Sequence, residues 1–599
     1  MVAFDVVYLT YRSQKWIDGC FDALLSAQYD LKMLNLFAVD NHSDDETVNV
    51  LKAKQEEYGG RFGAFVVKSN EENLGFGAGN NIGAALGHAP YLFFCNIDTA
   101  VYEDTFQALS DAIESDAGTD IAVWELRQFP YEHPKCYNPL TGVTSWSSGA
   151  AFVIRRDVFE QINGFDERFF MYAEDVDLSW RVRMAGYRLR YVPKAVINHY
   201  CYQTAGEIKP IQYVNSIVGN LVLRTKFGSL KERLWGHVCV LRSCLRANVP
   251  FDGVGKQIFM AYCASLNKLY SARRWRRKNR KRIDAETFVF HELDYEFRRK
   301  GDFWTCSRPK DFPLVSVIVR TCGRPDVLRE TLISLCNQTY PNIEVVVVED
   351  GKDASQEMII SEFSDLRIQY HATKEKRGRC VVGNIGMESA NGEYFNFLDD
   401  DDVFYADHVE TLVAALQNNT EFRVAYALGA QTPIRMISQE PYQYELIGYE
   451  HAVDFPFNRL RLLQQNYLPI QSVMFARCLY EEYGGFDTHL NVLEDWELWT
   501  RYAVKEKFLY IPKTTSQYRV PFCSGQSDER QKKLDAAYAE VRQKISKRVY
   551  QWTAEEISRE YEMCVQAEFR TSYENRGPAY RVLRKAYRLL KGIARRFLH

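Results

Sequence analysis

The sequence lacks several features, and each absence excludes a class of protein. Its 14 cysteines are scattered without any Cys-x-x-Cys pair, so they predict reduced core residues of a cytosolic protein, not a disulfide framework or zinc site. No uncharged apolar run reaches the roughly 18 residues that a spanning helix needs. No basic leader with an apolar stretch precedes the first strand-like run, residues 4–9, so we expect no secretory signal.

The sequence also has little net charge. The formal charge is -3, with 46% hydrophobic and 26% charged residues, which excludes a mostly disordered chain. The near-neutral total also argues against a nucleic-acid partner. Because 599 residues exceed one hydrophobic core, we expect two large domains.

The chain contains an internal repeat, because residues 4–200 and 314–520 share one order of elements. Each copy has a β-branched run closed by threonine, a second apolar run ending in aspartate, a third ending in acids, and later a Gly-Phe-Asp turn before a Glu-Asp pair. The matched residues are Thr10 and Thr321, Asp40 and Asp350, Asp98 and Asp399 to Asp402, Gly164 and Gly485, and Glu174-Asp175 and Glu494-Asp495. Strands alternating with helical stretches predict open α/β sheets, whose ligands gather at the carboxyl ends of the strands.

The repeat divides the chain into four segments. We expect a first α/β domain, a helical linker with a basic run, a second α/β domain, and C-terminal helices ending in a basic amphipathic one. The predicted bounds are 1–205, 206–311, 312–530 and 531–599.

The acids suit transfer of a sugar from a nucleoside diphosphate. An aspartate that ends the second strand can accept from a nucleobase N–H, as Asp40 and Asp350 would. Acids beyond the third strand suit Mg²⁺ or Mn²⁺ held against a diphosphate. A partly buried acid near the acceptor can deprotonate the attacking hydroxyl, and Asp175 and Asp495 are the candidates. The alternative for both Glu-Asp pairs is capping of a helix.

Both halves resemble inverting glycosyltransferases of family 2, which have the nucleotide-diphosphosugar transferase fold called GT-A. The motifs in the first half resemble rhamnosyltransferase-type members, and those in the second the general family pattern. They are Asn73 to Asn81, Asn96-Ile97-Asp98 and Phe170 to Leu178 in the first half, and Arg377-Gly378, Asn384-Ile385-Gly386, Gly392-Glu393-Tyr394 and Leu398 to Asp402 in the second.

The resemblance implies a role for each matched position. Asp40 and Asp350, with Thr10 and Thr321, would bind the donor nucleotide; Asp98, His199, Asp399 and Asp401 would hold the metal; and Asp175 and Asp495 would be the bases. Apart from the resemblance, we expect Trp146 and Trp496 to line the acceptor site, because sugars stack on indole faces, together with Glu174 and Glu494 beside the bases. Core packing is the alternative for both tryptophans, and a satisfied polar residue is the alternative for His199. Asn96 replaces the first acid of the usual Asp-x-Asp, and no histidine follows Pro512.

The expected enzyme is a bifunctional transferase that uses dTDP- or UDP-sugars to extend a bacterial surface glycan, with rhamnose suggested for the first half. The alternative is one catalytic domain beside a glycan-binding or scaffolding domain.

Basic residues gather in two places. Lys and Arg make up eight of the ten residues 273–282, and eight of the 24 residues 576–599. In the second stretch, apolar residues from Leu583 to Phe597 step by three and four, as on a helix that lies on an anionic bilayer. We therefore expect peripheral attachment at the inner face of the cell membrane and a lipid-linked acceptor. The alternative is a helix packed on its own protein.

Overall fold

The computed structural model describes most of the chain. The described residues are 1–132, 135–201, 204, 207–245, 248–284, 287–291, 294–295, 299–301, 304–305, 307–451, 454–522 and 537–574. The amphipathic stretch predicted at residues 583–597 lies outside them.

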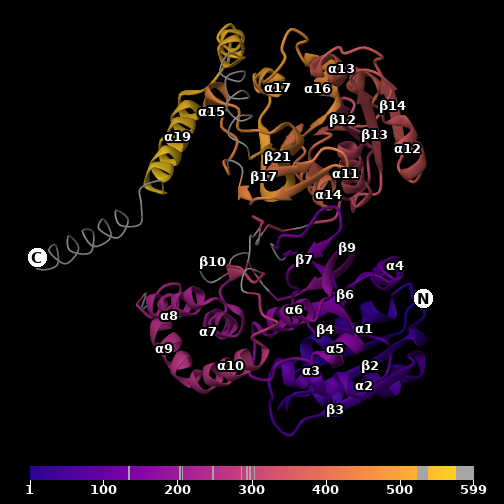
Figure 1. Cartoon of the computed structure of the whole chain (residues 1–599), viewed down its shortest axis with the longest axis vertical. Helices are drawn as coiled ribbons and strands as arrows, with labels where there is room; N and C mark the ends of the chain where they lie inside the picture. Colours follow the sequence, from indigo (N-terminus) through magenta and orange to yellow (C-terminus); the bar gives the residue numbers. More distant parts are fainter. Residues whose placement is uncertain are drawn as a thin grey trace, which may run out of the picture.

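The first domain is a curled mixed sheet covered by helices (Figure 1). Its strands are β1 Phe4–Thr10, β2 Leu34–Asp40, β3 Ala64–Ser69, β4 Tyr91–Asn96, β5 Thr99–Val101, β6 Ile121–Phe129, β7 Val143–Thr144, β8 Ala151–Arg155 and β9 Arg188–His199. Its helices are α1 Gln14–Leu25, α2 Thr47–Tyr58, α3 Phe76–Ala84, α4 Thr105–Ser115, α5 Arg156–Gln161 and α6 Glu174–Met184, with 3-10 turns at Leu31–Met33 and Gly59–Arg61.

The second domain repeats this architecture. Its strands are β12 Val315–Thr321, β13 Ile343–Glu349, β14 Ile368–Ala372, β15 Tyr394–Asp399, β16 Val403–Phe404, β17 Val424–Ser438, β18 Gln443–Leu446, β19 Glu450–His451, β20 Val473–Ala476 and β21 Phe508–Pro521. Its helices are α11 Pro325–Cys336, α12 Gln356–Glu362, α13 Arg379–Ser389, α14 His408–Asn418, α15 Arg459–Gln464, α16 Arg477–Tyr483 and α17 Glu494–Tyr502, with a 3-10 turn at Ile470–Ser472.

The two sheets have the same topology. The strand order is β3-β2-β1-β4-β8-β6-β9-β5 in the first and β14-β13-β12-β15-β20-β17-β21-β16 in the second. The first four strands of each are parallel. Three of the four are mostly buried, as the apolar runs predicted, whereas the edge strands β3 and β14 are partly exposed. The predicted α/β class and the internal repeat are therefore confirmed.

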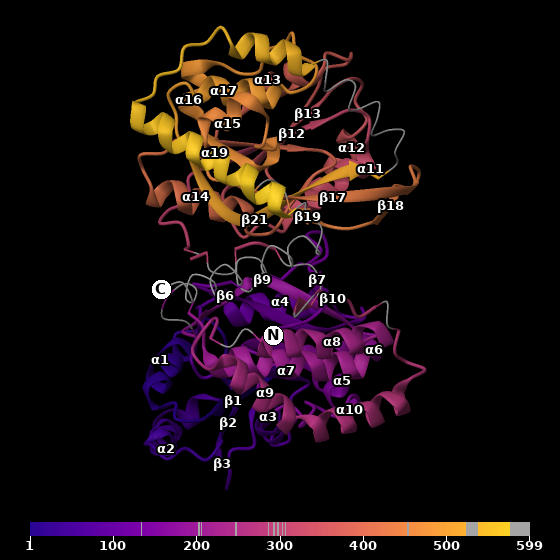
Figure 2. The same cartoon turned by 90° about the vertical axis from the view of Figure 1, so that its left-hand side faces the viewer.

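Helices follow each sheet. Four come after the first domain, α7 Pro210–Phe227, α8 Leu230–Cys244, α9 Val254–Ala264 and α10 Leu266–Asn279, with a small hairpin of β10 Phe290–His291 and β11 Asp294–Tyr295. Residues 537–545 and α19 Ala554–Glu574 are helical after the second domain. Figure 2 shows α7 to α10 together on one flank of the first domain.

Buried charges join the two domains. Arg299, from the linker, donates to Glu132 of the first domain at 3.2 Å and to Asp407 of the second at 3.4 Å. Lys513 contacts the same two carboxylates at 2.6 and 2.5 Å. These side chains are at most 4% exposed, so the domains are held by paired charges in a low-dielectric setting.

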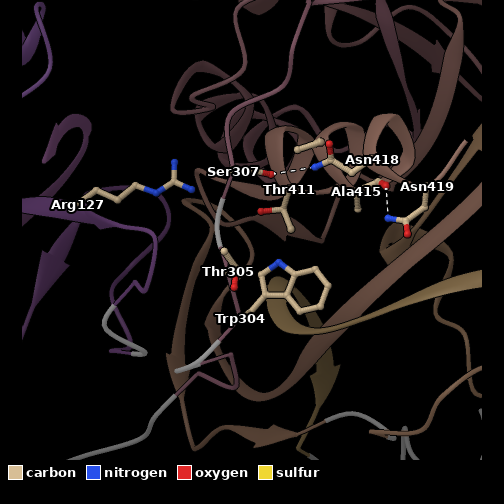
Figure 3. Close-up of a pocket in the computed structure, with 9 residues that line it drawn as sticks. Arg127, Trp304, Thr305, Ser307, Thr411, Ala415, Asn418 and Asn419 are labelled. Carbon is tan, nitrogen blue, oxygen red and sulfur yellow. Dashed lines mark hydrogen bonds between the residues drawn. The ribbon is translucent and has the colours of Figure 1, made fainter. Parts of the chain in front are cut away.

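A small pocket lies beside this junction (Figure 3). It is lined by Arg127 of β6, by the linker around Trp304, and by α14 from Thr411 to Asn418. Its nine lining residues include none of the predicted site residues, so the pocket is separate from the candidate active sites.

Candidate active sites

The end of β2 fixes Asp40 at the carboxyl edge of the first sheet. Thr10 lies opposite Asp40 in register, and its hydroxyl donates to Asp40 Oδ1 at 3.0 Å. The backbone N–H of Ser43 donates to Asp40 Oδ2 at 2.8 Å. The structure therefore places this predicted pair where ligands of open α/β sheets bind.

In the second domain the residue opposite the threonine is not the predicted aspartate. Register pairs Thr321 with Glu349, so Glu349, one residue before Asp350, occupies the position of Asp40. The hydroxyl of Tyr370 donates to Glu349 Oε2 at 2.8 Å. Asp350 shares the residue type of Asp40, whereas Glu349 shares its position relative to the first residue of the strand.

Asp350 anchors a loop instead. It accepts from the N–H groups of Arg377 at 2.6 Å and of Gly378 at 3.1 Å, just before α13. Asn41, at the same position in the first domain, donates to the carbonyl of Gly75 at 2.9 Å, just before α3. Asp350 and Asn41 therefore each hold the backbone just before equivalent helices, α13 and α3.

The structure brings Asp98 and His199 together in the first domain. Asp98 follows β4, and its Oδ1 lies 3.6 Å from His199 Nε2. His199 Nδ1 lies 2.8 Å from Gln128 Oε1, so Nδ1–H donates to Gln128 and Nε2 is directed toward Asp98. Burial raises the pKa of Asp98, but the hydrogen bond and charge of His199 outweigh it and lower the pKa.

Most of the acids after β15 are already paired in the second domain. Arg320 donates to both oxygens of Asp399, at 2.7 and 2.9 Å. Asp400 accepts from the Thr321 hydroxyl at 2.7 Å and from Arg324, and Asp402 accepts from the Arg519 N–H at 3.2 Å. The predicted role of Asp399 as a metal ligand is therefore not supported, because a bidentate arginine occupies its oxygens.

Asp401 is the acid that remains available. Its side chain is 41% exposed, and Arg324 approaches it only to 3.5 Å. The shared register of β4 and β15 places Asp401 at the position of Asp98. Each site thus keeps one accessible carboxylate at the same point.

Three positions around the second site are arginine, and the equivalent positions of the first site are not. The second site has Arg320 at the end of β12, Arg324 before α11 and Arg379 at the start of α13. The matching residues of the first domain are Leu9, Ser13 and Phe76.

The two predicted bases begin equivalent helices, α6 and α17. Asp175 accepts from the N–H of Gly149 at 2.9 Å, and Asp495 from Asn466 Nδ2 at 2.9 Å. Burial raises the pKa of Asp175. Burial and then the charge of Glu494 raise the pKa of Asp495 to about 7, which suits a general base at neutral pH.

Both helices start after a strained residue. Ala173 has φ 75° and Leu493 has φ 60°, the left-handed region that side chains other than glycine rarely adopt. Backbone strain of this kind clusters at functional sites. Its recurrence at two equivalent points supports a functional role for the Glu-Asp pairs beyond helix capping.

The glutamates beside the bases have different environments. Glu494 accepts from Arg320 at 2.9 Å, and Arg379 lies 3.6 Å away. Glu174 Oε2 is buried without a hydrogen-bond partner among the described residues. Burial and the neighbouring Asp175 raise the pKa of Glu174 well above its ordinary value.

The two tryptophans also differ. Trp496 is fully buried, and its indole N–H donates to the Leu462 carbonyl at 2.5 Å. It therefore packs in the core and cannot line an acceptor surface. Trp146 is half-buried beside Lys135, whose ammonium lies 4.3 Å from the ring centroid.

The acids of each domain converge. In the second, Arg320 bridges Asp399 and Glu494, the neighbours of Asp400 and Asp495. In the first, Gly149 donates to Asp175, and the next residue, Ala150, accepts from the N–H of Asn96 at 2.9 Å. Residues distant in the sequence therefore form one site per domain.

The residues fit a divalent metal ion in the first domain only. Asp98 and His199 are metal-ligand types, and Gln128 orients the imidazole as an outer partner does. Register places Tyr518 at the position of His199 in the second domain, beside the single acid Asp401. Within the described ranges, no cluster of three or more His, Cys, Asp or Glu is placed to hold a metal.

The repeated sheet and its converging acids define a glycosyltransferase. The chain belongs to glycosyl transferase family 2, whose profile matches residues 5–177 and 316–467.

Several known proteins are similar to parts of the chain. An uncharacterized glycosyltransferase of Haemophilus influenzae is 26% identical over 231 residues, 37% of this chain and 84% of that protein. The chain spans 58% of a Rickettsia typhi relative, at 28% identity over 32% of this chain. The mannosyltransferase PcManGT from Pyrobaculum calidifontis, solved with GDP-Man and Mn²⁺, is 14% identical with a TM-score of 0.32, covering 46% of this chain and 84% of that one.

Among the described residues, none of the helices combines the length with the hydropathy that a membrane-spanning segment needs.

Proposed function

We propose that the chain is a bifunctional inverting glycosyltransferase that adds two sugars, or one sugar in two linkages, to a growing bacterial surface glycan. The observation that carries this proposal is the presence of two sites with one strand order and acids at the same points. A scaffolding domain has no need for a buried, desolvated carboxylate at the start of a strained helix, whereas a general base does.

The proposed chemistry is direct displacement. Asp175 or Asp495 takes the proton of the acceptor hydroxyl, whose oxygen bonds to the anomeric carbon of the donor. The bond from that carbon to the nucleoside diphosphate breaks, and the configuration inverts. Thr10 with Asp40, and Thr321 with Glu349, hold the nucleotide end.

In the first domain, Asp98 and His199 would hold Mg²⁺ or Mn²⁺ near the diphosphate. A bound divalent ion neutralises the charge that develops on the leaving group. In the second domain Arg324 lies near Asp401, and Arg320 and Arg379 lie near Glu494.

The donors we propose are dTDP- or UDP-sugars. A stretch of 61 residues, 10% of this chain, is 48% identical to an N-acetylglucosaminyl-diphospho-decaprenol L-rhamnosyltransferase of Mycobacterium tuberculosis and covers 20% of that protein. This similarity supports rhamnose as a transferred sugar and a lipid-linked acceptor. We infer dTDP-rhamnose as the donor and the inner face of the membrane as the place of transfer. The basic stretch 576–599 would add membrane affinity.

Two single substitutions test the proposal. Asp175→Asn and Asp495→Asn should each remove a different linkage, with a rate loss of roughly 10²–10⁴-fold. The measurement is linkage analysis of the product by mass spectrometry and NMR, with unchanged thermal melting as the control. If both variants lose the same linkage, or one loses none, only one domain is catalytic.

A specific contact favours the second candidate function. Arg320 fills the space between Asp399 and Glu494, so the second domain would bind the glycan without transferring to it. Under that reading Asp495→Asn changes glycan affinity and no linkage.

A further inference from the structure

The outward face of α8 is apolar. Its buried residues are Gly236, Cys239, Val240 and Ser243. The residues on the opposite side of the helix, at helical spacing, are Leu230, Leu234, Val238, Leu241 and Leu245. They are between 48% and 85% exposed. A soluble surface helix normally has the reverse pattern, with its apolar stripe facing the core.

The next two helices extend this surface. Phe259 and Met260 of α9 are 52% and 61% exposed, and Leu266 and Tyr270 of α10 are 53% and 65% exposed. Figure 2 shows the three helices on the same flank of the first domain. Exposed apolar side chains gathered on neighbouring helices mark interaction sites.

The same helices carry a strong positive charge. Residues 229–282 contain 14 Lys and Arg but only two acids, in a chain whose formal charge is -3. Arg273, Arg274, Arg277 and Lys278 of α10 are all exposed. The basic run that the sequence singled out therefore adjoins the exposed apolar residues.

We propose that α8, α9 and α10 form a docking surface for an anionic lipid bilayer. Exposed leucines, Trp235 and Tyr270 beside basic residues are the pattern of helices that lie in a membrane interface. A second copy of the chain would bring two strongly basic surfaces together, and the basic stretch 576–599 would meet the same repulsion. A nucleic acid would use the charges but leave the leucines exposed to water.

The surface is rigidly joined to the first active site. Lys226 of α7 contacts Asp166 at 2.6 Å and also Asp177 of α6. Gly219 of α7 lies so close to Ala173 that an added Cβ would come within 2.7 Å of the Ala173 side chain. Docking would therefore set the height of Asp175 above the bilayer.

Binding of the full chain to vesicles tests the docking proposal. The assay involves no sugar transfer, so failure of the docking proposal is distinguishable from failure of the proposed function. The probe is sedimentation with phosphatidylcholine vesicles that contain or lack phosphatidylglycerol. We expect binding to the anionic vesicles only. Each basic residue near such a surface strengthens binding roughly fivefold, so Arg273→Gln with Arg274→Gln and Arg277→Gln should weaken it about 100-fold.

The apolar part has its own variant. Leu234→Glu with Leu241→Glu should weaken binding at least about tenfold, because the buried apolar area is lost and charge repulsion is added. Matched controls are Ile360→Glu, 68% exposed on α12, and the triple change Lys52→Gln, Arg61→Gln and Lys68→Gln at exposed sites of the first domain. Both controls should bind like the unaltered chain.

Three outcomes would overturn the proposal. The first is that the unaltered chain does not bind anionic vesicles, and the second is that the α8 variant Leu234→Glu with Leu241→Glu binds them as tightly as the Ile360→Glu control. The third is that light scattering shows loss of a dimer in the α8 variant while its vesicle binding is unchanged. Because all substituted side chains are exposed, the variants should have the melting temperature of the unaltered chain. If the α8 variant melts at a lower temperature, Leu245→Glu takes its place, because Leu245 is 85% exposed.

Discussion

The two sites have the same backbone and different charge arrangements. Where the first domain has Leu9 and Asn96 on adjacent strands, the second has Arg320 and Asp399. The arginine also reaches Glu494, whereas Glu174 Oε2 has no partner within the described part of the chain. The arginine at the end of β12 is therefore accompanied by an acid on the adjacent strand, and it also pairs with a glutamate that both domains have. Each site still keeps one accessible carboxylate, Asp98 or Asp401.

Removing Arg320 should have the largest effect. Arg320→Leu removes the cation shared by Asp399 and the buried Glu494 and leaves Glu494 only the longer contact with Arg379 at 3.6 Å; loss of one partner of a buried ion pair typically costs about 3–5 kcal/mol. Urea unfolding measures the loss. Arg320→Leu combined with Asp399→Asn copies Leu9 and Asn96 and should recover much of the stability. Equal midpoints for Arg320→Leu and the unaltered chain would contradict the prediction.

Metal binding should depend on the first domain. Gln128 orients His199, and loss of such an outer partner typically weakens metal affinity roughly 10–100-fold. Gln128→Leu should show this loss when Mn²⁺ binding is followed by electron paramagnetic resonance. The matched change Gln431→Leu removes the acceptor of the Tyr518 hydroxyl at 3.0 Å in the second domain and should leave Mn²⁺ binding unchanged. The reverse result would place the metal in the second domain.

The smallest effect is a difference in pH dependence. Burial and Glu494 raise the pKa of Asp495 to about 7, and only the deprotonated form accepts a proton. The rate of the second-domain linkage should therefore fall about tenfold per pH unit below pH 7 and level off above it. Glu494→Gln removes a neighbouring negative charge and should move the midpoint down. A midpoint below about pH 5 in the unaltered chain would contradict this assignment.

Much of the fold could be predicted from the sequence. Apolar runs of strand length alternate with helical stretches, and their repetition set the strand ends of both domains. The third-strand acids and the Glu-Asp pairs were found because residue type and order recur together. These features could be predicted because the pattern of apolar and polar residues within each short segment determines them.

The remaining errors concern contacts across strands. Asp350 was matched to Asp40 because both are aspartates, but register depends on the strand start and selects Glu349. Arg320 and Asp399 are 79 residues apart, so their pairing has no local signal. Burial of Trp496 likewise depends on packing against Leu462 and Tyr538, whereas residue type alone allows both stacking on a sugar and core packing.

Arg299 has a consequence for how the chain melts. It belongs to the linker, yet Glu132 of one domain and Asp407 of the other depend on its charge. If either domain opened alone, it would leave a desolvated ion of its neighbour without a counter-charge. Heating should therefore give one shared heat-absorption peak in calorimetry instead of one peak for each domain.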